Sequence, residues 1–414
     1  MGCQVRQRDV PGEAAVGRQS LAADSDEMDG DLKHVRVILG VDAISPPLTG
    51  IGRYVQSLAR GLKRHPGIAA ARYYAHGRWV AQPAALLNPR LPLNFLRRHV
   101  PFRRWARRAY HAVNDAVSRA KLAAYRDWLF HAPNYIAPEF AMRAVCTIHD
   151  LSHLHMPEHH PRDRVEYLLR ELPRTLERAA HVITVSEFVR AEVIAEFGLA
   201  PEQVTAVPLG VEPTYHPREA GALDAALARH GLVHGGYLLA VATLEPRKNL
   251  ERLLDAYARL SPALRRAFPL VLVGGRGWRN EALLARVARM QAQGELRWLG
   301  YVAEGELPFM YAGAAAFAFP SLYEGFGLPV LEAMASGVPV LTSNRASLPE
   351  VAGDAAILVE PEDIVAMTEG LERMLTDMAW RESAATRGIE RARAFTWEAC
   401  VDRTVAIYGK VDSA

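Results

Sequence analysis

The sequence is poor in cysteine and has no long apolar run. Its 414 residues include three cysteines, at positions 3, 146 and 400, an odd number of residues spaced far apart. This pattern argues against a disulfide framework and fits a reducing compartment. No apolar run reaches the roughly 18–20 residues that span a bilayer, and the N-terminus lacks the apolar stretch of a signal peptide. We therefore expect a cytoplasmic protein.

Metal-binding motifs are also scarce. The one Asp-x-Asp string, Asp24-Ser-Asp26, lies in residues 1–33, whose polar composition predicts a disordered extension. Four histidines, at positions 153, 155, 159 and 160, match no zinc-ligand spacing and are predicted to lie in a solvated loop. We predict that the protein uses no metal and no cofactor.

What the sequence does contain is an alternation of short β-rich runs and longer helical stretches. This alternation predicts an α/β fold with parallel sheets covered by helices on both faces, and the length favours two domains. Strands are predicted at residues 35–40, 144–148, 181–185, 204–207, 237–242, 270–273, 296–299, 314–319 and 338–341, and helices at 54–64, 163–180, 250–260, 281–293 and 396–411. The irregular stretch around Pro213 and Pro217 is the predicted domain boundary.

Glycine-rich and charged segments follow many of these strands. Ligands of open α/β sheets bind beyond the carboxyl ends of the strands, so the segments should gather on one edge of each sheet. Two such edges facing each other would make a cleft between the domains. The segments are residues 47–52, 149–150, 243–249, 274–277, 321–327 and 342–344.

The segment from Glu324 to Glu332 is the strongest local signal. Pro329 suits the first turn of a helix and Gly337 its end. Glu332 would then lie near the first turn, where a carboxylate can accept hydrogen bonds from the two hydroxyls of a ribose. Glu324, one loop earlier, can reach the hydroxyls of a sugar beyond a diphosphate. The alternative is that both are surface or helix-N-terminal acids.

Arg247 and Lys248 are well placed for a diphosphate, because they follow a predicted buried strand. Arginine offers a fork of donors and lysine a point charge, and both would stabilise charge on a departing nucleoside diphosphate. The alternative is a solvated charge pair at the start of a helix.

Two weaker signals lie in the first half. Gly50 and Gly52 form a glycine-rich turn that would let backbone N–H groups approach a phosphate or sugar, although taken alone the motif favours a plain turn. His149 follows a predicted strand and points either to contact with the transferred sugar or acceptor or to a buried structural histidine.

The segment from Arg90 to Arg126 is strongly basic, with ten Lys or Arg against one acid, Asp115, and interleaved aromatic residues. Such a segment favours an anionic membrane surface as partner. A solvated pair of helices is the alternative, and nucleic acid is not expected.

With these residues assembled, the chain resembles the GT-B glycosyltransferases of family 4, the "group 1" transferases. The marks are the segment Glu324 to Glu332, residues 243–250, and Ser343-Asn344 with residues 348–351. Residues 147–151 with Met156-Pro-Glu158 look like the bacterial mannosyl- and rhamnosyltransferases that build surface polysaccharides. The resemblance covers residues 35 to the C-terminus.

The resemblance implies two Rossmann-like domains: an acceptor-binding domain at residues 34–212 and a donor-binding domain at 213–395. It also implies a final helix, 396–414, that crosses back to the first domain. It implies retaining, metal-independent transfer, with Glu332 on the ribose, Glu324 on the transferred sugar, Arg247 and Lys248 on the diphosphate, and His149 near the sugar. The donor residues assigned in this way are Gly50, Gly52, Thr243, Arg247, Lys248, Glu324, Gly325, Phe326, Gly327, Leu328 and Glu332; the catalytic ones are Glu324, His149, Arg247 and Lys248.

On resemblance alone, the expected donor is GDP-mannose or a related nucleotide sugar, and the expected acceptor is a glycan or a polyprenyl-diphosphate-linked glycan. Two other classes of protein remain open. A nucleotide-sugar epimerase or isomerase of similar build would form product from donor alone. A non-catalytic nucleotide-sugar-binding protein would bind donor without turnover.

Overall fold

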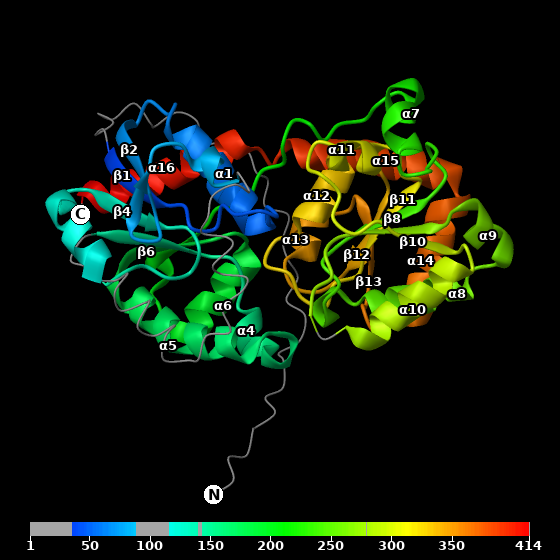
Figure 1. Ribbon diagram of the computed structural model, residues 1–414, viewed down its shortest axis with the longest axis horizontal. Coiled ribbons are helices and arrows are strands. Elements are labelled where there is room, and N and C mark those ends of the chain that lie inside the picture. Colours follow the sequence, from blue (N-terminus) through cyan, green and yellow to red (C-terminus); the bar gives the residue numbers. More distant parts are fainter. Residues whose placement is uncertain (1–34, 88–115, 140–142, 279, 414) are drawn as a thin grey trace, which may run out of the picture. The chain divides into compact units, whose positions relative to one another are not determined.

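The computed structural model describes residues 35–87, 116–139, 143–278 and 280–413. These residues form two sheets, which belong to one compact unit, His34–Ala414. We call the part that contains the first sheet the first lobe and the part that contains the second sheet the second lobe (Figure 1). The predicted N-terminal extension, residues 1–33, lies outside the described residues.

The first sheet has seven strands, and all neighbouring pairs are parallel except β2 and β3. In spatial order its strands are β3 (Arg78–Val80), β2 (Ile68–Ala75), β1 (Val35–Gly40), β4 (Leu129–Ala132), β5 (Ala144–Ile148), β6 (Ala179–Thr184) and β7 (Val204–Ala206). Its helices include α1 (Gly50–Leu62), α4 (Ser152–His155), α5 (Arg162–Arg178) and α6 (Glu187–Phe197).

The second sheet has six strands, all parallel. Their spatial order is β10 (Leu296–Trp298), β9 (Leu270–Val273), β8 (Leu238–Val241), β11 (Ala316–Phe319), β12 (Val340–Ser343) and β13 (Ala356–Val359). The helices are α7 (Ala220–Ala228), α8 (Leu250–Arg259), α9 (Pro262–Ala267), α10 (Glu281–Ala292), α11 (Leu307–Ala312), α12 (Leu328–Ala335), α13 (Leu348–Ala352), α14 (Ile364–Thr376) and α15 (Met378–Arg393).

Alternate residues of the second sheet explain why helices cover both of its faces. Leu238 and Leu272 pack in a core with residues of α8, α10 and α14, whereas Leu239 and Val271 pack with residues of α12 and α13. Strands buried on both faces are nearly continuous hydrophobic runs, as in Leu270–Val273. The predicted fold class of two Rossmann-like parallel-sheet halves is confirmed.

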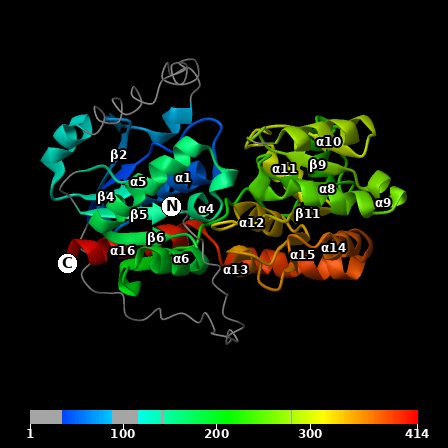
Figure 2. The ribbon, with the colours of Figure 1, turned by 90° about the horizontal axis from the view of Figure 1, so that it is seen from below.

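The last helix, α16 (Trp397–Ser413), packs against α1 and β6 of the first lobe (Figure 1, Figure 2). The chain passes between the lobes at two places that lie together, because Val211 and Thr396 form an isolated parallel bridge. Gly210 is tightly packed there, and a Cβ on it would lie 2.2 Å from the Trp397 nitrogen.

One local prediction was wrong. Gly50 and Gly52 do not form a loop but the first turn of α1, which begins at Gly50 rather than at residue 54. The Thr49 side chain caps this turn by accepting from the Gly52 N–H at 3.2 Å. Glu332 is the fifth residue of α12 and so lies near the first turn, as predicted. Pro329 and Gly337 do mark the start and the end of that helix, as predicted.

Candidate active site

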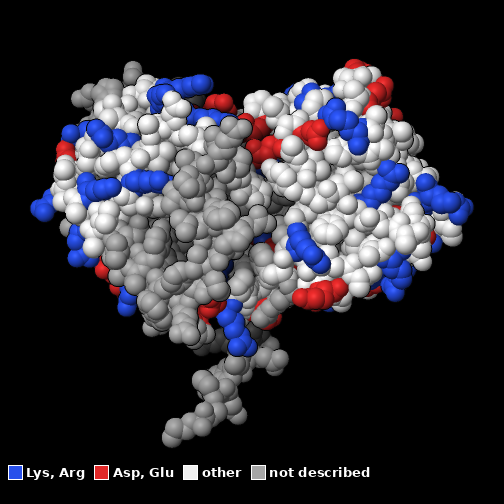
Figure 3. Space-filling view, in the orientation of Figure 1, with Lys and Arg blue, Asp and Glu red and all other residues white. Residues whose placement is uncertain are grey.

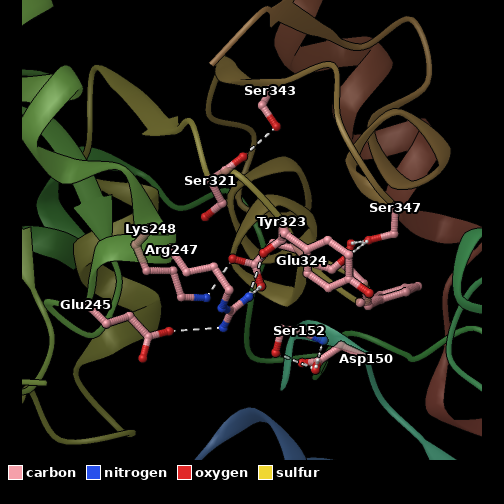
Figure 4. Close-up of polar contacts among 12 residues, drawn as sticks. Asp150, Ser152, Glu245, Arg247, Lys248, Ser321, Tyr323, Glu324, Ser343 and Ser347 are labelled. Atoms are coloured by element: carbon pink, nitrogen blue, oxygen red, sulfur yellow. Dashed lines mark hydrogen bonds and ion pairs between the residues drawn. The ribbon is translucent and has the colours of Figure 1, made fainter. Parts of the chain in front are cut away.

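Arg247 and Lys248 converge on Glu324 at the carboxyl edge of the second sheet. The two cations follow β8 in a short 3₁₀ helix, Pro246–Lys248, and Glu324 lies in the loop after β11. Arg247 Nη1 lies 3.0 Å from Glu324 Oε2, and Lys248 Nζ lies 2.6 Å from Oε1. Figure 4 shows both side chains pointing toward this carboxylate. One acid therefore pairs with both cations.

Asn249 explains why the two loops meet. It adopts the left-handed conformation, with φ +56°, which asparagine tolerates better than most residues. Its side-chain amide donates to the carbonyls of Pro320, at 3.0 Å, and Pro361, at 2.6 Å. In addition, the Leu322 N–H donates to the Arg247 carbonyl at 2.9 Å. The loop after β8 is thus tied directly to the loop that carries Glu324.

Further acceptors surround Arg247. Its Nη2 donates to Glu245 Oε1 at 3.0 Å, and Nη1 also donates to the Tyr323 carbonyl at 2.6 Å (Figure 4). Its Nε is buried and has no hydrogen-bond partner among the described residues. The side chains of Arg247 and Lys248 are 12% and 13% exposed, so water screens their charges only weakly.

The electrostatics of the site keep its acids ionised. Burial alone would raise the pKa of Glu324, but Arg247 and Lys248 outweigh it and hold the pKa below its ordinary value. Burial also acts to raise the pKa of Asp150, whereas Arg247 and the hydrogen bonds from Ser152 lower it strongly. Ser152 donates to Asp150 Oδ1 from its backbone N–H at 3.0 Å and from its hydroxyl at 2.7 Å. The ionised carboxylates of Glu324 and Asp150 therefore lie close to the positive charge of Arg247.

Glu332 has a different partner from the other predicted donor residues. It is buried on α12, and its carboxylate accepts a hydrogen bond from Arg53 of α1, in the first lobe. Arg53 also donates to Glu304 at 3.2 Å. Burial raises the pKa of Glu332, and Arg53 opposes this rise together with the nearby tyrosines 311 and 215. The Tyr311 hydroxyl nevertheless makes no hydrogen bond of normal geometry with the described residues.

His149 is a buried histidine beside the loop that carries Glu324. Its Nε2–H donates to the Pro133 carbonyl at 2.7 Å, and burial lowers its pKa, so the ring is neutral. A Cβ on Gly325 would lie 1.7 Å from the His149 carbonyl oxygen, a separation that no side chain permits. Glycine is therefore required at position 325, where the two lobes touch.

The other predicted donor residues lie around the same loop. Ser347 holds it by donating from its hydroxyl to the carbonyls of Glu324, at 2.8 Å, and Phe326, at 2.9 Å. Gly327 precedes α12 with φ +112°, a conformation that favours glycine. Leu328 lies close to Gly50, since a Cβ on that glycine would be 3.6 Å from the Leu328 side chain. Thr243 lies two residues after the end of β8, beside the glycines at 274 and 277.

The histidine-rich stretch was predicted to be solvated, which is wrong for His153 and His160 but is confirmed for the exposed His155. His153 and His160 are 2% and 4% exposed, because this stretch is packed between α5 and the loop after β9. Burial lowers the pKa of each to about 4. His160 Nε2 lies 2.8 Å from the Ser152 hydroxyl, whereas neither ring nitrogen of His153 has a partner among the described residues.

Sequence reasoning gave no separate role to four residues of the charged contacts: Asp150, Glu245, Tyr323 and Arg53. The first three lie inside polar segments that were singled out, and Arg53 follows Gly52 directly, so the sequence marked the segments but not these side chains. Their partners depend on contacts between elements far apart in the sequence, such as Arg53 on α1 with Glu332 on α12, which are 279 positions apart.

The basic segment from Arg90 to Arg126 lies mostly outside the described residues, which resume at position 116. Its described end includes the short 3₁₀ helix Ala123–Tyr125, and Arg72 stacks 5.1 Å from the Tyr125 ring centre. On the face in Figure 3, Lys and Arg side chains are spread over the coloured surface rather than gathered in one patch. None of the described helices is long and apolar enough to cross a membrane.

Known proteins resemble this chain over most of its length. The protein family described as "Glycosyltransferase Family 4" matches residues 48–215, and the family described as "Glycosyl transferases group 1" matches residues 232–394. The O-antigen chain mannosyltransferase B of Escherichia coli is 39% identical over 383 residues, which cover 90% of this chain and 99% of that protein.

Solved structures share the fold. Sucrose-phosphate synthase from Thermosynechococcus elongatus matches with a TM-score of 0.72 at 22% identity, over 92% of this chain and 100% of that one. Anabaena HepE in complex with UDP and glucose matches with a TM-score of 0.66 at 15% identity, over 90% of this chain and 99% of that one. The two sheets and these matches define a glycosyltransferase of the GT-B type. The chain belongs to glycosyltransferase family 4, the group 1 transferases, as its sequence motifs predicted.

Proposed function

We propose that this enzyme transfers mannose from GDP-mannose to a glycan or a polyprenyl-diphosphate-linked glycan during assembly of a surface polysaccharide. The identity to the Escherichia coli O-antigen mannosyltransferase, over nearly the full length of both chains, supports mannose and this class of acceptor. The single observation that carries the chemistry is the convergence of Arg247 and Lys248 on Glu324.

The two cations supply the charge that the reaction needs. Breaking the glycosidic bond of the donor leaves negative charge on the nucleoside diphosphate, and poorly solvated cations stabilise that charge strongly. Before donor binds, Glu324 pairs with both cations, and Glu245 pairs with Arg247 as well. A diphosphate that takes its place on Arg247 and Lys248 releases the Glu324 carboxylate to accept hydrogen bonds from hydroxyls of the transferred sugar. Because the side chains supply two positive charges, the reaction should proceed without a metal.

We expect retention of the anomeric configuration. No described residue of the site is an obvious nucleophile, because the proposal assigns the Glu324 carboxylate to hydroxyls of the transferred sugar. The departing diphosphate can instead accept the proton of the acceptor hydroxyl on the face from which it leaves. The new glycosidic bond then forms on that same face, and the released GDP carries the proton.

A donor screen with product analysis tests this function. Purified protein is incubated with GDP-mannose, UDP-glucose or UDP-galactose and an α-mannosyl oligosaccharide, with EDTA present, and the products are followed by mass spectrometry and NMR. We expect acceptor-dependent GDP release and a new α-linked mannose, the same anomer as in the donor. Product formed from donor alone would favour an isomerase, and binding of donor without turnover would favour a non-catalytic protein. A covalent sugar trapped on any carboxylate would contradict the retaining step as written.

We also propose that the enzyme works at the cytoplasmic face of the membrane, held there by the segment from Arg90 to Arg126. Its ten basic residues against one acid support attraction to anionic lipid. Co-sedimentation with phosphatidylglycerol vesicles at low salt should exceed that with phosphatidylcholine vesicles and should fall as salt is added. Protein that stays in the supernatant with both kinds of vesicle would refute the attachment.

A further inference from the structure

Helix α6 of the first lobe contacts the loop of the second lobe that carries Glu324. The Ser186 hydroxyl, which precedes the helix, donates to the Gly325 carbonyl at 2.7 Å. The backbone N–H groups of residues 187 and 188 donate to the Glu350 carboxylate at 3.0 and 3.2 Å. One turn further along, Glu192 accepts from the Tyr323 hydroxyl at 2.5 Å. These contacts fasten α6 to the sequence neighbours of Glu324 on both sides.

Tyr323 is the member of this group that also holds a donor-site cation. Its hydroxyl donates to Glu192 and accepts from the Leu151 N–H at 3.0 Å, both in the first lobe. Its carbonyl accepts from Arg247 Nη1 at 2.6 Å in the second lobe (Figure 4). The same residue thus links the first lobe to Arg247, and Glu324 follows it directly in the chain.

The surroundings of Tyr323 leave its ring little freedom. The side chain is buried, with the ring of Phe188 at 5.8 Å and that of His155 at 6.0 Å between centres. His155 Nε2 lies 3.1 Å from the other oxygen of Glu192, so this carboxylate is itself fixed by a second partner. A hydrogen bond from a phenol to an oriented carboxylate is among the stronger ones, because the acceptor is charged.

We propose that Tyr323 is a positioning residue for sugar transfer. Its hydroxyl, held by Glu192 and the Leu151 N–H, fixes the loop whose carbonyl and carboxylate orient Arg247. The inference rests on the proposed function, because it takes Arg247 as the group that stabilises the departing diphosphate. Both lobes then contribute to one function, since the second provides the cation and the first sets its position through Tyr323.

The other contacts of α6 make this role separable from docking of the lobes. Ser186 and Glu350 hold the same helix without using Tyr323, so Tyr323→Phe should leave the lobes in contact. What the variant loses is the constraint on the loop. Tyr257 offers a matched control, since it is also buried and its hydroxyl lies within hydrogen-bond distance of three backbone carbonyls in the second lobe, away from the site.

The test compares Tyr323→Phe, Glu192→Ala, their double variant, Glu192→Gln and Tyr257→Phe in steady-state transfer, with thermal melting of each. We expect Tyr323→Phe and Glu192→Ala each to lower kcat about tenfold, with donor KM changed less than about twofold, since the cation acts mainly as charge builds in the transition state. The double variant should be no slower than the single ones. Glu192→Gln keeps an acceptor oxygen and should recover part of the rate. Tyr257→Phe should lower Tm and leave kcat unchanged.

Three outcomes would overturn the proposal. The first is a Tyr323→Phe enzyme with unchanged kcat and only a lowered Tm. The second is a double variant whose loss is the product of the two single losses, because it would show that Tyr323 and Glu192 act separately. The third is an equal loss of kcat in Tyr257→Phe. Arg247→Ala separates this proposal from the proposed function: normal transfer by that variant would refute the site itself, whereas its impairment beside an unimpaired Tyr323→Phe would refute the positioning role alone.

Discussion

Replacing Arg247 by alanine removes the group that balances three acids. Its guanidinium donates to Glu245 and Glu324, at 3.0 Å each, and it is the main charge that keeps the pKa of Asp150 low. In the reaction, losing one preorganised donor to the developing charge typically costs about 10²–10³ in kcat, or about 2.7–4 kcal/mol. We expect Arg247→Ala to fall in this range, with Lys248→Ala close to it.

The same substitution should also destabilise the fold. The Arg247 side chain is 12% exposed, and breaking a buried ion pair on one side costs about 3–5 kcal/mol because a charge is left uncompensated. Lys248 still pairs with Glu324 in the variant, at 2.6 Å, so we expect a loss near the lower end of this range. Denaturant unfolding of the Arg247→Ala variant and of the unsubstituted protein measures this loss of stability.

Two comparisons separate catalysis from stability. Arg247→Lys keeps the charge but loses the fork of donors, and it should recover part of the rate. Arg265→Ala removes a similarly shielded arginine that pairs with Glu295 at 3.1 Å in the second lobe, and it should lower stability without slowing transfer. If Arg247→Ala transferred mannose at nearly the normal rate, or if Arg265→Ala slowed transfer equally, the assignment of Arg247 to the departing diphosphate would be refuted.

Three further predictions follow from contacts between the lobes and from the site charges. Arg53→Ala leaves the Glu332 carboxylate buried without its cation, so thermal melting should show a loss of about 3 kcal/mol that Glu332→Gln partly restores in the double variant. Gly325→Ala places a methyl group against the His149 carbonyl, so transfer should drop below detection while Gly221→Ala, at an open position, stays active. The pKa of Glu324 is lower in the folded protein than in the unfolded chain. Its contribution to the free energy of unfolding is therefore present above about pH 4.5 and is lost as pH falls through the folded-state pKa. Glu324→Gln should make Tm fall less steeply on the acid side of a curve of Tm against pH, and an unchanged curve would contradict the pairing.

The sequence predicted the position of the site, through its buried strands, better than it predicted the contacts between the side chains of the site. Residues 35–40, 144–148 and 270–273 coincide with β1, β5 and β9, because buried parallel strands are compact apolar runs with abrupt ends. The polar segments that follow such strands were therefore placed on the correct edge. Strand β2 was missed because its alanines and Arg72 weaken the apolar pattern.

The partners of the charged residues were not readable from the sequence. Lys248 and Glu324 are 76 positions apart, and their pairing depends on how Asn249 ties two loops together. The burial of His153 likewise depends on packing against helices that its own neighbours do not reveal. Periodicity reports the environment of a strand or helix, whereas an ion pair between loops is decided by the tertiary fold.

The bridge between Val211 and Thr396 has a consequence for how such chains can change. The chain leaves the first lobe at one end of this bridge and re-enters it at the other, so the whole second lobe is topologically an insertion with adjacent ends. A segment with adjacent ends can be exchanged for another without lengthening either connection or cutting the sheet that receives it. The second lobe can therefore be exchanged as one unit, and a chimera that joins residues 35–211 and 396–413 to the second lobe of another family member has its splice points already side by side.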